Sequence, residues 1–160
     1  MTSLVVYSSQ TGNTRKLAET VRDALPGKTE MASIEEAPRP EGYDLVAVGF
    51  WLQAGKPDPK AAAYLQKVHH VPLLLFATHG AASDSDHARN AMASAADLAP
   101  TADLLGTFHC PGEVNPKVLE KIRAKTPPPP WIADADAAVG HPDTEDLARL
   151  ENVISALNLQ

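Results

Sequence analysis

The sequence is short of several features that would set it apart from ordinary soluble proteins. It contains a single cysteine, which excludes a disulfide within the chain and fits a reducing compartment. No apolar run approaches the roughly 20 residues that a membrane-spanning helix needs. The first residues also lack the charged and then apolar segments of a secretion signal. We therefore expect a cytoplasmic protein without a membrane partner.

Positive charge is scarce as well. The chain has 14 Lys and Arg residues against 20 Asp and Glu residues, for a net charge of −6. Proteins that bind nucleic acid need a basic surface, so we expect no nucleic-acid partner. The acidic balance would suit a basic docking protein, although it also keeps many proteins in solution. The length of 160 residues and the 44% apolar content indicate one domain with a substantial core, spanning residues 1–160.

Segments with the pattern of buried strands alternate with segments of helical periodicity. Continuous apolar runs such as Leu45–Phe50 and Val71–Thr78 are typical of strands buried on both faces of a parallel sheet. The pattern predicts strands at residues 4–7, 29–34, 45–50, 71–78 and 104–109, helices at 13–25, 59–68, 85–98, 115–124 and 143–157, and a cap at Asp84. Residues 51–59 and 126–131 are expected to be loops. We predict an α/β fold with a doubly wound parallel sheet and helices on both faces.

The run Ser8–Thr14, between the first strand and the first helix, carries the strongest functional signal. It joins Gly12 to a series of hydroxyl and amide side chains. Backbone N–H groups and the helix dipole at such a turn favour a bound anion, most simply a phosphate. No Lys or Arg lies within the run, which indicates a site that holds a phosphate rather than transfers it. The alternative is an ordinary helix cap, which any one of these residues could supply.

Two more loops follow strand ends that a doubly wound sheet brings to the same edge as Ser8–Thr14. The first begins at Trp51, whose ring could stack on a planar ligand, belong to the core or anchor a surface contact. The second runs from His79 to Ser83 and is small and polar. A ligand with a phosphate tail and a planar aromatic head would fit all three loops.

These residues resemble the flavodoxin family. The segment Ser9–Thr14 matches the family's phosphate-loop signature, Thr/Ser-x-Thr-Gly-x-Thr, at its place after the first strand. A tryptophan opens the loop after the third strand, Thr78–Gly80 forms a Thr-x-Gly loop after the fourth, and His-Pro-Asp at 141–143 precedes an acidic helix. The resemblance covers essentially the whole chain. It implies a five-stranded sheet of order 2-1-3-4-5, a tightly but non-covalently bound FMN, and electron transfer between redox partner proteins, a reductase and an acceptor.

The resemblance also implies which residues contact the cofactor. The phosphate would be held by Ser9, Gln10, Thr11, Gly12, Asn13 and Thr14. One side of the isoalloxazine ring would be lined by Phe50, Trp51, Leu52 and Gln53, and the other side by Thr78, His79 and Gly80.

The chain departs from the family pattern at two places. Ala81, Ala82 and Ser83 stand where the third loop usually supplies a tyrosine that covers the outer ring face, and Leu52-Gln53 replaces the usual Gly-Asp after the tryptophan. An uncovered ring face could admit a substrate. His79 could lie close to the ring, where a positive charge would favour the reduced flavin, or it could be a loop histidine bonded to the backbone.

Other kinds of site fail because essential residues are absent. Cys110 lacks the arginine six residues later that a phosphatase loop needs, since Pro116 stands there. The Gly-Lys-Ser/Thr run of a nucleoside-triphosphate loop is missing. His69-His70 and the pair His79 and His87 lack cysteine or carboxylate partners at metal-ligand spacing. We therefore expect no metal, and we interpret Cys110 as a strand-end residue near the cofactor edge.

Three functions remain open at this point. The favoured one is a monomeric, one-domain FMN electron carrier that serves redox partner proteins, rather than a stand-alone enzyme. The second is an FMN-dependent oxidoreductase that acts on a quinone, a tetrapyrrole or a similar planar substrate. The third is a binding or regulatory module that keeps the fold without flavin. Because the chain has no Gly-rich dinucleotide motif, we expect no turnover of NAD(P)H by the protein alone.

Overall fold

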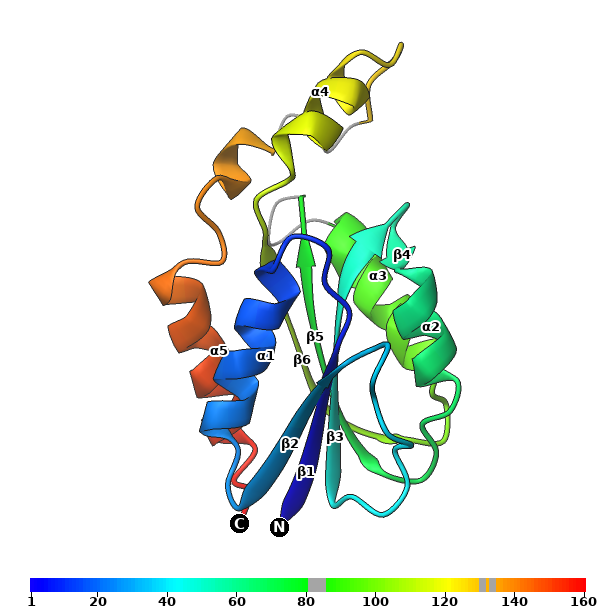
Figure 1. Ribbon diagram of the computed structural model, residues 1–160, viewed down its shortest axis with the longest axis vertical. Helices are drawn as coiled ribbons and strands as arrows, with labels where there is room; N and C mark the ends of the chain where they lie inside the picture. Colours follow the sequence, from blue (N-terminus) through cyan, green and yellow to red (C-terminus); the bar gives the residue numbers. More distant parts are fainter. Residues whose placement is uncertain (81–85, 130–131, 133–134) are drawn as a thin grey trace.

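A central sheet with helices on both faces organises the chain, as the computed structural model in Figure 1 shows. The structure describes residues 1–80, 86–129, 132 and 135–160. The strands are β1 (Thr2–Tyr7), β2 (Lys28–Ser33), β3 (Leu45–Gln53), β4 (Lys56–Pro57), β5 (Pro72–His79) and β6 (Asp103–Pro111). The helices are α1 (Asn13–Ala24), α2 (Pro59–Leu65), α3 (Asp86–Asp97), α4 (Pro116–Arg123) and α5 (Thr144–Ala156), with a short 3₁₀ helix, η2 (Asp136–Ala138).

The five long strands run parallel in the order β2-β1-β3-β5-β6. This confirms the predicted doubly wound sheet, because β5 and β6 are the fourth and fifth strands of the predicted order. The order reverses direction between β1 and β3, and in open α/β sheets such a reversal leaves a crevice at the carboxyl ends of the strands. The loops that follow β1, β3 and β5 meet at this edge.

Two apolar clusters, one on each face of the sheet, form the core. On one face, α1 and α5 cover side chains such as Val5 and Phe76 with Leu17 and Leu150. On the other face, Leu65 of α2 and side chains of α3 pack on the opposite residues of the same strands. Alternate residues of a strand point to opposite faces, so apolar residues at successive positions fill both clusters. The continuous apolar runs of the sequence are explained by this double burial.

The segment after β3 differs from the prediction. Residues 51–59 were expected to form a loop, but β3 continues to Gln53, and β4 returns beside it as an antiparallel strand. Ala54 and Gly55 form the turn, both with positive φ (52° and 77°), as two-residue hairpin turns require. This sixth strand was not predicted, because it has two residues and one of them is a proline.

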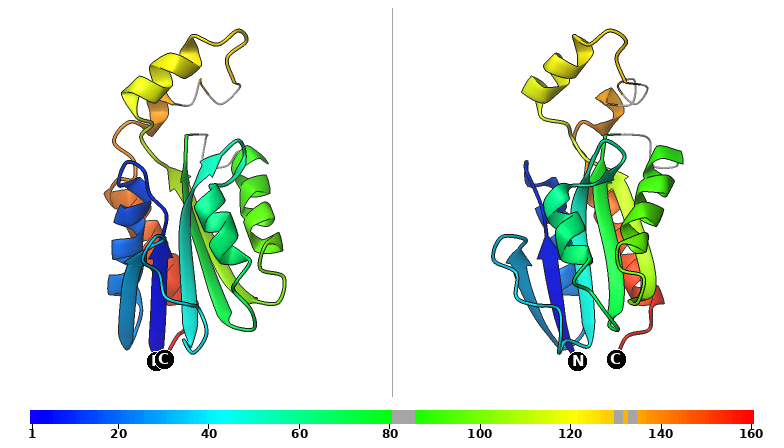
Figure 2. Two further views of the ribbon diagram at one scale, coloured as in Figure 1. Left: turned by 45° about the vertical axis from the view of Figure 1, so that its right-hand side comes forward. Right: turned by 90° about the vertical axis from the view of Figure 1, so that its right-hand side faces the viewer.

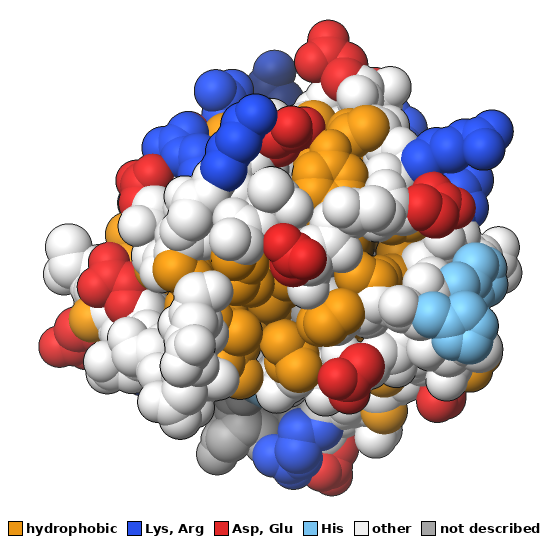
Figure 3. Space-filling view, turned by 90° about the horizontal axis from the view of Figure 1, so that it is seen from below, with side chains coloured by type: hydrophobic (Ala, Val, Ile, Leu, Met, Phe, Trp, Pro, Cys, Tyr) orange, Lys and Arg blue, Asp and Glu red, His pale blue; other side chains and the backbone are white. Residues whose placement is uncertain are grey.

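Helix α4 lies beyond the carboxyl ends of the strands, away from the two layers of helices (Figures 1 and 2). None of its side chains is buried. The chain termini lie at the other end of the molecule. Viewed from that end, acidic and basic side chains are interspersed around the rim, with apolar side chains nearer the centre (Figure 3).

Two further expectations concern the ends of helices. Helix α5 begins after Asp143, whose side chain accepts a hydrogen bond from the backbone of Asp146, and this agrees with the predicted start. The predicted cap at Asp84, the start of its helix at Ser85 and the loop residues 81–83 lie outside the described residues.

Candidate functional site

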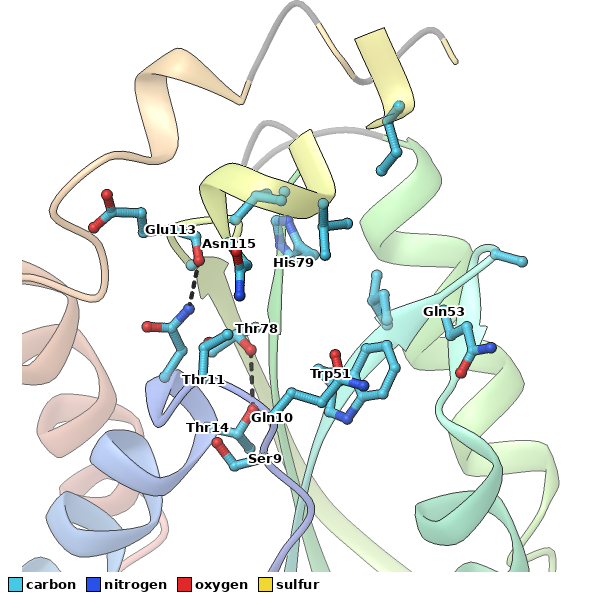
Figure 4. A pocket seen from close by; sticks show the side chains of 18 of the residues that line it. Ser9, Gln10, Thr11, Thr14, Trp51, Gln53, Thr78, His79, Glu113 and Asn115 are labelled. Carbon is cyan, nitrogen blue, oxygen red and sulfur yellow. Dashed lines mark hydrogen bonds between the residues drawn. The ribbon is translucent and has the colours of Figure 1, made fainter. Parts of the chain in front are cut away.

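A cleft of about 570 Å³ lies at the carboxyl ends of the strands (Figure 4). Its walls come from the loops after β1, β3, β5 and β6, and from α3 and α4. The residues that line it are Ser9, Gln10, Thr11, Asn13, Thr14, Trp51, Leu52, Gln53, Ala54, Gly55, Thr78, His79, Gly80, His87, Gly112, Glu113, Val114, Asn115, Val118, Ile122, Lys125 and Pro129. The structure therefore brings the three predicted loops together.

The N-terminus of α1 differs from those of the other helices whose caps are described. Helices α2, α4 and α5 each begin with a side chain, Asp58, Asn115 or Asp143, that accepts a backbone N–H from the first turn. Helix α1 begins at Gly12 with φ 91° and has no side-chain cap, and its first turn contains no acidic residue. The first N–H groups of a helix have no partner within the helix. The backbone N–H of Gly12 donates to the hydroxyl of Ser9 at 3.1 Å, but the N–H groups at the start of α1 have no side-chain cap, which suits an anion.

The side chains of Thr14 and Asn13 bond this loop to neighbouring segments. The hydroxyl of Thr14 is buried, 3.0 Å from the hydroxyl of Thr78 and 3.4 Å from the carbonyl oxygen of Phe50. The amide of Asn13 donates to the carbonyl oxygen of Glu113 at 2.9 Å. A phosphate contact at these two residues therefore depends on their backbone N–H groups. The more exposed side chains of Ser9, Gln10 and Thr11 remain directed at the cleft (Figure 4).

The structure separates the two aromatic residues at the end of β3. Trp51 is half-buried and lines the cleft (Figure 4). Phe50 is fully buried in the core on the face covered by α2 and α3 and does not line the cleft. Neighbouring strand residues point to opposite sides, so both rings cannot face one ligand. The Phe50 side chain therefore lies outside the cleft, whereas Leu52 and Gln53 line it. The contacts of Phe50, Trp51, Leu52 and Gln53 with a cofactor ring stay predictions.

Asp58 is a buried residue that the sequence analysis missed. Its carboxylate accepts hydrogen bonds from the hydroxyl of Ser8 at 2.8 Å, from the backbone N–H of Ala61 at 3.1 Å and from the backbone N–H of Trp51 at 3.4 Å. It thereby connects the start of the loop Ser8–Thr14, the β3–β4 hairpin and α2. An Asp-Pro pair before a helix is a recognisable cap, but its link to Ser8 depends on the fold.

His79 contacts His109, a partner that was not predicted from the sequence. It is buried, and its Nε2 lies 3.0 Å from Nδ1 of His109 on β6. Burial lowers the pKa of the His109 imidazole, and the guanidinium groups of Arg149 and Arg89 lower it further. The predicted neighbours of His79, Thr78 and Gly80, also line the cleft.

The segment after β6 supplies a further wall that was not predicted. Gly112 packs so closely that a Cβ there would lie 2.9 Å from Nδ2 of Asn13. Beyond it, Val118 and Ile122 of α4 line the upper part of the cleft. Val118 is 45% exposed. The helical spacing of Val118, Leu119 and Ile122 marks α4 as amphipathic in the sequence, but its position over the cleft depends on the path of the chain.

The single cysteine, Cys110, does not line the cleft. Cys110 lies on β6 beside Thr78 in the register, fully buried. Burial raises the pKa of its thiol far above the ordinary value, with a further contribution from Asp146. Reactive cysteines are exposed and ionise easily, so we interpret Cys110 as a core residue. It was predicted to lie near the cofactor edge, and in the sheet it pairs with Thr78, which lines the cleft.

Comparisons with known proteins agree with this geometry. A profile of the flavodoxin domain matches residues 4–155. The chain is a member of the flavodoxin family. It is 32% identical over 130 residues to the flavodoxin-like domain-containing protein BilS of Clostridioides difficile (strain CD3), which covers 78% of this chain and 72% of that protein.

Two solved structures show the same fold at low sequence identity. A flavodoxin from Streptococcus pneumonia TIGR4 superposes with a TM-score of 0.66 at 13% identity, covering 99% of this chain and 98% of that one. A flavoprotein in complex with FMN from Lactobacillus acidophilus NCFM superposes with a TM-score of 0.53 at 15% identity, covering 68% and 92%. Within the described part of this flavodoxin-family chain, no helix has the length and apolar character to cross a bilayer.

Proposed function

We propose that this protein binds FMN in the cleft and carries electrons between redox partner proteins. The observation that carries the proposal is the N-terminus of α1, which has no side-chain cap and no acidic residue and opens on the cleft. A phosphate with about −1.5 to −2 charges at pH 7 would replace the missing cap. The FMN complex of the related Lactobacillus fold adds support for this choice of ligand.

The residues of the cleft divide between the two ends of such a ligand. Backbone N–H groups of the segment 12–14 and the side chains of Ser9, Gln10 and Thr11 would hold the phosphate. Trp51, Leu52 and Gln53 on the hairpin would line one side of the ring, with Thr78, His79 and Gly80 on the other. When bound, FMN would supply the electron-accepting ring. The protein would position that ring at the open end of the cleft.

The phosphate assignment predicts a difference between FMN and riboflavin. We expect FMN to bind at least about 30-fold more tightly, because charge-assisted hydrogen bonds contribute about 1.5–3 kcal/mol each and 1.4 kcal/mol corresponds to tenfold. Fluorescence titration of the apo protein with each ligand measures this ratio. Equal affinities for FMN and riboflavin would place the phosphate away from α1 and refute the assignment.

A second candidate function is an FMN-dependent oxidoreductase for a quinone, a tetrapyrrole or a similar planar substrate. The observation that favours it is the apolar wall of α4, where Val118 and Ile122 line the cleft above the flavin loops. An apolar wall opposite Trp51 would suit a second flat molecule.

Reduction by NAD(P)H distinguishes the two candidates. For an electron carrier, we expect the FMN-loaded protein alone to leave NAD(P)H unoxidised, and a separate reductase to be needed. Absorbance at the nicotinamide band, followed with and without an added flavodoxin reductase, provides the measurement. Steady turnover by the protein alone, stimulated by an added quinone, would support the oxidoreductase instead. As a carrier, the protein is expected to act as a monomer in the cytoplasm.

A further inference from the structure

Two histidines form a direct link at the end of β5. His79 Nε2 and His109 Nδ1 are 3.0 Å apart, and their ring centroids are 5.1 Å apart with the planes tilted by 46°. This geometry allows a hydrogen bond in the planes of the rings rather than stacking. One proton occupies the bond, and either imidazole can donate it, according to its tautomer.

The two rings belong to different cavities. His79 lines the cleft at the carboxyl ends of the strands, and Figure 4 shows it at the end of β5 near α4. His109 lines a separate cavity of about 260 Å³ between α3 and β6, together with Arg89, Met92 and Thr107. The hydrogen bond therefore connects the cleft with a second opening on the side of the molecule.

Burial and nearby charges oppose a positive charge on His109. Burial lowers the pKa of its imidazole most, and the guanidinium groups of Arg149 of α5 and Arg89 of α3 lower it further. The cleft that His79 lines is also lined by the titratable residues His87 of α3, Glu113 of the β6–α4 loop and Lys125 beyond α4. Arg89 and Arg149, which pair with Asp86 and Asp146, oppose a positive charge on His109, so negative charge added in the cleft would favour a proton on the pair.

We propose that the His79–His109 pair takes up a proton from the side cavity when an electron enters the cleft. The pair then places a positive charge beside the reduced ligand. This inference rests on the proposed function, because a redox partner protein supplies the electron. A docked partner would cover the cleft, and the cavity between α3 and β6 would remain open to water.

The proton path conserves charge and atoms. In the neutral pair, His109 Nδ1–H donates to His79 Nε2, and His109 Nε2 has no proton. A proton from water binds His109 Nε2, and the proton of the hydrogen bond then moves from His109 to His79. The positive charge ends on His79, at the cleft, and His109 is neutral again. Oxidation of the ligand by the acceptor protein reverses both steps.

The first test uses the apo protein and needs no cofactor. Imidazole ¹⁵N chemical shifts of His79 are followed against pH in the wild type and in His109→Phe and His109→Gln. We expect the pH midpoint of His79 to fall by at least about 0.5 unit in His109→Phe, because the protonated ring loses its acceptor. We expect a smaller change in His109→Gln, whose amide oxygen can accept the bond. An unchanged midpoint in both variants overturns the pairing.

The second test measures protons directly. The FMN-loaded protein is reduced by dithionite at pH 7 in weak buffer, and proton uptake is read with an indicator dye. We expect the wild type to take up more protons than His79→Gln and His109→Gln, by as much as one per molecule. His69→Gln, at an exposed residue that bonds Thr101, serves as the matched control and should equal the wild type. Equal uptake in all four proteins overturns the proposal.

The two tests separate the failure of this inference from that of the proposed function. If FMN does not bind, the proposed function fails, and the shifts of the apo protein still decide whether the two histidines share a proton. If FMN binds and all variants take up equal numbers of protons, the proposed function stands and the role of the pair is refuted.

Discussion

Replacing Thr11 with aspartate is expected to lower the affinity for FMN by at least about 100-fold while leaving the apo protein as stable as the wild type or slightly more stable. The new carboxylate would stand beside the uncapped N-terminus of α1. Two unit charges 4 Å apart near a protein surface interact by about 4 kcal/mol. A 100-fold loss of affinity corresponds to about 2.8 kcal/mol, so repulsion between the carboxylate and the phosphate is large enough to cause it.

The effect on stability has the opposite sign from the effect on binding. A negative charge near a helix N-terminus stabilises the helix by about 0.3–1 kcal/mol, and Thr11 is exposed. The aspartate would occupy the place that the phosphate takes in the loaded protein. Urea unfolding of the apo protein and FMN titration measure the two quantities separately.

Thr11→Asn is the matched control for this variant. It has nearly the same shape as aspartate and no charge, so we expect FMN affinity to fall by less than about tenfold, corresponding to at most 1.4 kcal/mol. If Thr11→Asp and Thr11→Asn bind FMN equally, repulsion plays no part and the phosphate does not lie at α1. If Thr11→Asp unfolds the apo protein, the loop has a structural role that the capping pattern does not explain.

The loop Ser8–Thr14 at the cleft could be recognised in the sequence because its elements are consecutive. A strand, a turn with Gly12 and a helix start lie within about fifteen residues, and each has its own local signal. The parallel sheet was accessible for a similar reason, since double burial produces continuous apolar runs. Local patterns thus predicted the edge at which the cleft forms.

The remaining features depend on contacts between distant segments. Phe50 and Trp51 are both aromatic, and only the register of β3 against its neighbours decides which one faces the cleft. His79 and His109 lie 30 residues apart, and no spacing rule pairs them. The wall from α4 depends on the turn after β6, where Gly112 approaches Asn13. Composition and periodicity do not predict contacts between residues that are distant in the sequence.

The hairpin formed by β3 and β4 holds the Trp51 side of the cleft by main-chain pairing, which a free loop lacks. Main-chain pairing of Leu52 with Pro57 and of Gln53 with Lys56 holds the segment after Trp51. Trp51 also accepts a hydrogen bond, through its carbonyl oxygen, from the backbone N–H of Asp58 at 3.1 Å. The backbone of Trp51 is therefore held by strand pairing and by hydrogen bonds with Asp58.

Asp58→Ala is expected to destabilise the protein by about 3 kcal/mol and to weaken FMN binding as well. Loss of a helix cap costs about 1 kcal/mol, and a buried hydroxyl without a partner costs about 1–3 kcal/mol. Both losses occur here, at Ala61 and at Ser8. For a protein of this size, the change should lower the Tm by about 6–12 °C. The hairpin would lose its link to the phosphate loop, so the emission spectrum of Trp51 should change too.

Two comparisons show whether the loss comes from the connection or only from the cap. Asp143→Ala removes the cap of α5, far from Trp51 in the sequence, and is expected to cost about 1 kcal/mol without affecting FMN binding. Ser8→Ala combined with Asp58→Ala should be less destabilising than the sum of the single variants, because the unpaired hydroxyl is removed. If Asp58→Ala and Asp143→Ala cost the same and FMN affinity is unchanged in both, Asp58 caps a helix and does nothing for the cleft.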